Sequence, residues 1–128
     1  MRTFEDVIAT ELLALLLAGA TLHAVRITVR EVVVERLGAG SLGPREVSET
    51  AAAAARAACR LVRQLGAPED VVEAVCRATL DAVRGHGGES ARWFGDATSA
   101  VFEALDELAR ERQEEPAWRW LVGRLPRW

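Results

Sequence analysis

The stretch AAAAARAACRLVRQLGAPEDVVEAVCRATL (residues 51–80) decides the fold of this chain. Alanine has the highest helix propensity and a very small side chain, so the run Ala51–Ala58 predicts a helix that can pack closely against a neighbour. Gly66 then marks a helix end and Pro68 a helix start, with acidic residues in the turn that follows. Helices joined by so short a turn lie antiparallel, which predicts an all-α fold.

The same pattern of glycine ends and proline starts divides the rest of the chain. It predicts an antiparallel helical bundle of four main helices, at about residues 4–37, 44–65, 68–84 and 90–115. Residues 1–115 form the bundle in this interpretation. Pro116 separates them from residues 116–128, a short C-terminal helix rich in tryptophan and arginine.

The first predicted helix contains a run, Leu12 to Leu22, in which every residue is apolar or small. The β-branched stretch at 25–34 also fits a strand, but no other segment offers a strand to pair with it. A seam with alternating spacings of three and four continues through this stretch and favours one helix over residues 4–37. The seam consists of Leu15, Ala18, Leu22, Val25, Val29 and Val32.

A helix that is apolar on all sides is either a central or self-associating element or a membrane span. A span needs about 20 apolar residues, and the uninterrupted run is shorter. Extending it over residues 7–29 includes Glu11 and Arg26, and each charge inside a span costs ~2.5–3.5 kcal/mol. We therefore favour a buried or self-associating helix. The alternative is a small membrane-associated protein with residues 7–29 as anchor and the tryptophan tail at the interface.

The C-terminal segment holds three of the four tryptophans. Tryptophan among arginines is typical of interaction hot spots and of segments at a membrane surface, while closure over the protein's own bundle is a competing interpretation. We predict a self-association or partner interface formed by the first helix and this tail. Its predicted residues are Leu12, Leu15, Leu16, Gly19, Leu22, Trp118, Trp120, Leu121, Leu125 and Trp128.

Two charged stripes are further candidate contact faces. Arginines at spacings of four and three share one face of the second predicted helix, and glutamates at spacings of four share a face of the fourth. Such stripes are more often solvated, or paired within the fold, than used for binding. The residues are Arg56, Arg60, Arg63, Glu103, Glu107 and Glu111.

No catalytic, cofactor or metal-binding motif stands out, which favours a protein that is not an enzyme and has no cofactor. Cys59 and Cys76 fall at similar heights on two antiparallel helices, and their contact is left open. Buried cysteines usually fill space. His23 and His86 are the only histidines, and neither has a ligand partner at metal-binding spacing.

Composition limits the class of partner. The net charge of −3 argues against a nucleic-acid binder. All 16 basic residues are arginine, a bias typical of GC-rich genomes, and the alanine- and arginine-rich helices are similar in composition to small bacterial helical proteins, including phasins, without assigning any residue. The start MRTFED lacks the basic region of a secretory signal. We expect a cytoplasmic scaffold or accessory protein that binds itself or another helical protein, with inner-membrane association as the alternative.

Overall fold

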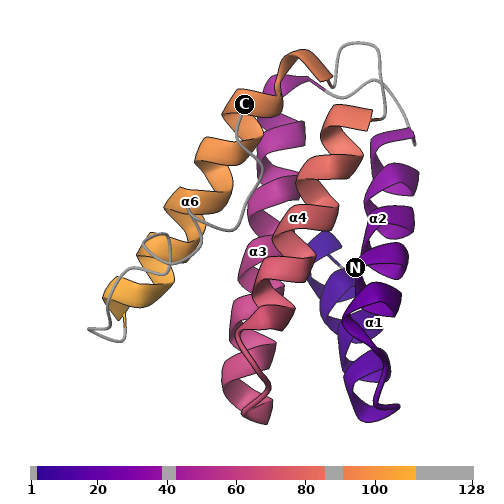
Figure 1. Ribbon diagram of the computed structural model, residues 1–128. Coiled ribbons are helices and arrows are strands. Elements are labelled where there is room, and N and C mark those ends of the chain that lie inside the picture. The colour runs from indigo at the N-terminus through magenta and orange to yellow at the C-terminus, as the bar shows by residue number, and fades with distance from the viewer. Residues whose placement is uncertain (1–2, 39–42, 86–90, 112–128) are drawn as a thin grey trace.

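The computed structural model describes residues 3–38, 43–85 and 91–111. These residues are organised as five labelled helices without any strand, so the all-α prediction is confirmed (Figure 1). The helical interpretation of the β-branched stretch at 25–34 is confirmed with it. The helices are α1 at Phe4–Leu17, α2 at Leu22–Gly38, α3 at Pro44–Leu65, α4 at Asp70–Gly85 and α6 at Phe94–Glu111.

The predicted single helix over residues 4–37 was wrong, because a tight turn divides it into α1 and α2. Gly19 adopts the left-handed conformation, with φ of 71°, and the N–H of Ala20 donates to the carbonyl of Leu15 at 3.0 Å. This is the arrangement by which glycine ends a helix. The Thr21 hydroxyl then accepts from the N–H of Ala24 at 3.1 Å and caps the start of α2.

The interruption changes which residues of α2 face the core. Val25 and Val29 of the predicted seam are buried, but the burial continues at Val33 and Leu37, a constant spacing of four. Leu22 stands on the first turn of α2 and is exposed. The seam therefore predicted the helix correctly, but it identified only part of the buried face of α2.

The remaining helices begin and end close to their predicted positions. α3 occupies the predicted residues 44–65, α4 begins at Asp70 rather than 68, and α6 is described as far as Glu111. The carboxylate of Glu46 accepts from the N–H of Gly43 at 3.0 Å and caps α3 at its start. Gly66, with φ of 66°, closes the other end of α3. The predicted tail at 116–128 lies outside the described residues.

α3 is the central helix, since α1, α4 and α6 all pack against it, while α2 packs mainly against α4. α3 and α4 run antiparallel, as their short turn requires (Figure 1). α6 packs chiefly on α3 and runs parallel to it, because Arg63 near the end of α3 donates to the carbonyl of Leu108 near the end of α6. The α1–α2 and α3–α4 turns lie at the same end of the molecule (Figure 1).

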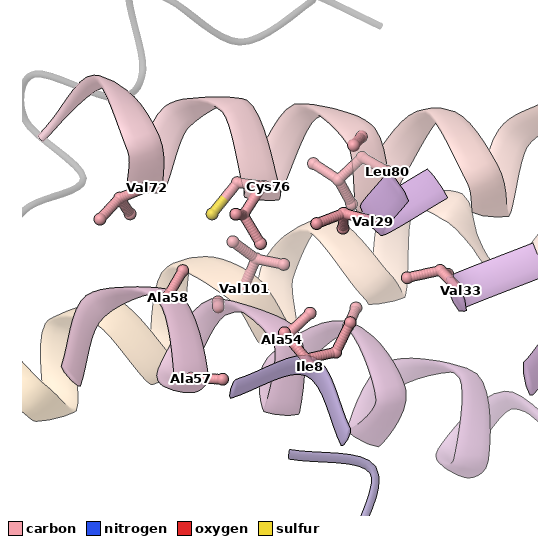
Figure 2. Packing of buried hydrophobic residues seen from close by; sticks show 14 of the residues in the cluster. Ile8, Val29, Val33, Ala54, Ala57, Ala58, Val72, Cys76, Leu80 and Val101 are labelled. Carbon is pink, nitrogen blue, oxygen red and sulfur yellow. The ribbon is translucent and has the colours of Figure 1, made fainter. Parts of the chain in front are cut away.

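The core is built from alanines of α3 and branched side chains of the helices around it. Ala51, Ala54 and Ala58 have no exposed surface, which shows how closely the neighbouring helices approach α3. Figure 2 shows side chains from α1, α2, α3, α4 and α6 gathered in one cluster. Ile8 and Leu12 are the two fully buried side chains that α1 contributes.

Candidate interaction surface

Three exposed leucines of the described residues lie close together in the chain, at the end of α1 and the start of α2, while Leu65, 43% exposed, stands at the end of α3. Leu17 is 73% exposed, Leu22 41% and Leu13 37%. Leu13 and Leu17 are one turn apart on the same face of α1, and Leu22 follows across the tight turn. We call these three residues the apolar tip. It arises because α1 is apolar on all sides but only one stripe of it can face the core.

The predicted interface residues of the first helix differ in how far they are buried. Leu12 is fully buried within the chain, and Leu15 and Leu16 are partly buried against the same core. Gly19 and Leu22 are exposed at the turn. The other predicted interface residues, Trp118, Trp120, Leu121, Leu125 and Trp128, lie outside the described residues.

Two of the three residues of the apolar tip, Leu13 and Leu17, were not among the predicted interface residues. Both lie in the run where every position is apolar, so the hydrophobic period could not tell the inner face of the helix from its outer face. The turn chemistry around Gly19 was the available signal. A helix that ends there must place the last leucines of α1 at the end of the molecule.

An ion-pair cluster attaches the start of α1 to the middle of α3. The carboxylate of Glu5 accepts from Arg56 Nε and from Arg60 Nη1, both at 3.0 Å. Arg56 also donates from Nη2 to Glu49 at 2.7 Å. Two of the three arginines of the predicted basic stripe therefore pair within the chain, one of the outcomes that the sequence interpretation left open.

The charge of Arg56 is stabilised where it stands. Its partial burial acts to lower the pKa of the guanidinium. The hydrogen bonds to Glu5 and Glu49, and the negative charges of these carboxylates, exceed that effect and raise the pKa above its ordinary value. Arg56 thus joins two carboxylates, Glu5 of α1 and Glu49 of α3, at the surface of α3.

A cleft of about 430 Å³ opens beside this cluster, between the starts of α1 and α3. Its walls include both carboxylates paired with Arg56, the Glu46 carboxylate that caps α3, and Arg36 at the end of α2. These carboxylates already have donors inside the protein. The geometry of the cleft therefore suits an internal connection between α1 and α3.

The other charged positions line the seam between α3 and α6. Arg63 Nη1 donates to the carbonyl of Leu108 at 3.3 Å. Glu103 and Glu107 of α6 line a groove of about 270 Å³ together with Arg45 and Arg56 of α3. Glu111 is exposed on the last described turn of α6. Two of the three glutamates of the acidic stripe thus line a groove to which α3 contributes arginine.

Cys59 and Cys76 lie in the core, and neither forms a disulfide. Complete burial, and to a lesser degree the charges of Cys59 and Glu73, raise the pKa of Cys76 from its ordinary 9.0 to about 12. A thiol with so high a pKa remains protonated at neutral pH and is a poor nucleophile or metal ligand. Cys76 therefore fills space in the core.

The described residues contain neither a candidate metal-binding group nor a candidate membrane-spanning helix. None of their histidine, cysteine, aspartate and glutamate side chains gather in groups of three or more that could hold a metal ion. His23 is exposed on α2, and His86 lies outside the described ranges. None of the described helices combines the length and the apolarity that crossing a membrane requires.

Comparison with known proteins adds no family to this description. The chain matches no protein family model, no curated protein and no solved structure. Its function must therefore be argued from its own surface.

Proposed function

We propose that this chain is a non-enzymatic helical interaction protein, a scaffold or accessory module, which associates with a second copy of itself through the apolar tip. In this proposal the helices form an antiparallel bundle, and the tryptophan tail at 116–128 contributes further apolar surface to the contact. Another helical protein is the alternative partner.

The observation that carries the proposal is the exposure of Leu17 together with Leu13 and Leu22. Small soluble proteins tolerate single exposed leucines, but exposed apolar side chains grouped at one place are typical of a contact surface. The neighbouring Ala14, Ala18 and Gly19 are exposed and small, so a second helix can approach closely there. A symmetric dimer covers such a patch with its own copy.

The test is the mass of the protein in solution, measured by light scattering or sedimentation over a range of concentrations. We expect a dimer or larger oligomer for the wild-type chain. Leu17→Glu places a charge in the centre of the patch and should give a folded monomer. Ile27→Glu is the matched control, since Ile27 is also exposed, at 46%, but stands outside the apolar tip.

The contribution of the tail is tested by deleting Trp118–Trp128. If the tail belongs to the contact, the shortened chain should dissociate at higher concentration than the full chain while its helix content per residue is kept. An unchanged oligomer would remove the tail from the proposal. A monomeric wild-type chain at every concentration would contradict self-association, and flotation of the chain with lipid vesicles would instead favour the membrane-associated alternative.

A further inference from the structure

The predicted seam of the first helix and the structure disagree at the turn at residues 18–21. The seam of alternating three and four spacings runs without a break from Leu15 through Ala18 and Leu22 to Val25. In the folded chain the turn interrupts this seam, and Ala18 and Leu22 are the two members left exposed. A straight helix would place them on one continuous stripe. The structure shows the bent arrangement, and the spacing of these residues is also compatible with a straight helix.

α1 is also the helix that can separate most easily from the rest. It contributes two fully buried side chains, Ile8 and Leu12, whereas α3 and α4 are buried along most of their lengths. Its other connection is the partly exposed pairing of Glu5 with Arg56 and Arg60 of α3. Its contact with α2, its neighbour in the chain, is small compared with its contact with α3. Nothing in this docking site requires α1 to come from the same chain.

We propose that α1 exchanges between two copies of this chain. The turn at residues 18–21 opens, α1 and α2 become one helix over residues 4–38, and α1 docks on α3 of the second copy. There Glu5 pairs with Arg56 and Arg60 of the other chain. This inference rests on the proposed self-association and specifies how the two copies are joined.

The dimensions agree with such an exchange. At about 1.5 Å per residue, the straight helix is about 52 Å long, and roughly half of it projects beyond the end of the molecule where the turn now lies. That end also carries Leu17 and Leu22 of the apolar tip. Two copies related by a two-fold axis would cross at this point and bring their exposed leucines together.

The balance of contacts also permits the exchange. Every contact that α1 makes with α3 is lost within one chain and regained between two, so the docking itself is nearly neutral. The straight form gains burial of the apolar tip, whereas Gly19 itself gains nothing, because glycine adopts the left-handed conformation as readily as the helical one. The opposing term is the entropy of joining two chains, so the exchanged form is favoured by concentration. Exchange of an identical element is a low-cost route to a dimer.

The decisive experiment reverses the charges of the α1–α3 contact in two variants, one changed on α1 and the other on α3. One copy carries Glu5→Arg, and the other carries Arg56→Glu with Arg60→Glu. Each copy alone has like charges at the contact, both within a chain and in its own dimer. In a mixed exchanged dimer both contacts join opposite charges again, which no unexchanged arrangement can achieve.

The two copies are refolded together from denaturant, and their mass and melting temperature are compared with those of each copy alone. A single chain carrying all three substitutions provides the reference in which position 5 again meets opposite charges within one chain, and like the second copy it lacks the Arg56–Glu49 pair. We expect the mixture to form a dimer with one chain of each kind, which melts several degrees above either copy alone. If the melting curve of the mixture is the sum of the curves of the two separate copies, α1 does not exchange. A dimeric wild type with that result keeps the proposed self-association, and a monomeric wild type contradicts both.

A second experiment does not depend on the charged contact. A side chain at Gly19 meets no atom within 4 Å, so Gly19→Ala acts only through the backbone and disfavours the bent turn. Because the dimer straightens two such turns, we expect its dissociation constant to fall by about tenfold or more. Gly66→Ala is the matched control, with the same left-handed conformation and the same free space. It should lower the melting temperature without favouring the dimer, and an equal response to both substitutions would overturn the exchange.

Discussion

α1 and α3 invert the usual relation between apolarity and burial. α1 contains the most apolar run of the chain, yet it lies at the edge of the molecule and leaves Leu13 and Leu17 exposed. α3 has alanine where α1 has leucine, yet it is surrounded by three other helices. Apolar residues in all directions give a helix no preferred side. The marked amphipathicity and small side chains of α3 let its neighbours approach from several directions.

The comparison shows that α3 is the central helix because its neighbours can pack very close to it. Around Ala54 and Ala58 the backbones of neighbouring helices come near enough to exclude all solvent. Leucine side chains at these positions would hold the helices apart. The bulkier α1 is left to cover one side of α3, and the leucines that it cannot bury become available to another molecule.

The largest difference should appear between two leucines of the same helix. Leu12→Ala removes a side chain with no exposed surface and should lower the free energy of unfolding by about 2–5 kcal/mol. Leu17→Ala removes a side chain that is mostly in solvent and should change it by about 0.5 kcal/mol or less in the monomer. Urea denaturation at a concentration where the chain is monomeric measures both values. Similar losses for the two variants would mean that α1 is covered on both faces.

The second comparison replaces one alanine of α3 and one alanine of α1 by leucine. Ala54→Leu overfills the centre of α3 and should cost about 1–3 kcal/mol of stability. Ala14→Leu adds an equal volume to the exposed face of α1 and should leave stability within about 0.5 kcal/mol. Thermal and urea unfolding of the two variants give the result. If Ala54→Leu were tolerated without loss, the close packing around α3 would be wrong.

A third prediction concerns the interior of the α3–α4 contact and its dependence on pH. Burial holds the pKa of Cys76 at about 12 in the folded chain, against 9.0 when it is exposed. Below pH 9 both states keep the proton and pH has no effect through this group. Between pH 9 and 12 only the unfolded chain loses it, so stability falls by about 1.4 kcal/mol per pH unit.

This prediction is measured by urea denaturation under reducing conditions at pH 8 and pH 10. The wild-type chain should lose about 1 kcal/mol more than Cys76→Ala between these two conditions. Equal losses would show that the thiol is not buried in the way described. A cysteine placed on the outer face of α1, by Leu17→Cys, should by contrast react with a thiol reagent without unfolding.

The smallest effect is expected at the ion pairs that join the two helices. Glu5→Gln weakens the hydrogen bonds to Arg56 and Arg60 and should cost about 0.5–1 kcal/mol, since the cluster is only partly buried. Glu11→Gln alters an exposed carboxylate on the same helix and is the control. The difference between the two variants should shrink in high salt, because salt screens exposed charges. A difference that is constant with salt would point to packing instead of charge.

The sequence predictions were mostly correct where the structure depends on neighbouring residues in the chain, and they failed where it depends on contacts between distant residues. The bounds of α3 were correct because Pro44 and Gly66 act on the backbone beside them. The single helix over 4–37 was wrong because one seam of leucines and valines was given more weight than the turn chemistry of Gly19 and Thr21. The pairing of Glu5 with two arginines of α3 joins residues far apart in the chain, and no spacing pattern could have indicated it.

The sequence by itself determined that this protein is helical and where most of its helices stop, because helix propensity and capping act over a few neighbouring residues. It also placed more apolar surface on the first segment than one face can bury. Only the tertiary structure decided that α3 is the centre, that α6 packs on α3, and that Leu13, Leu17 and Leu22 stay outside. Those outcomes depend on how closely whole helices can pack. The packing distance depends on the side chains of both helices, so it cannot be read from one segment alone.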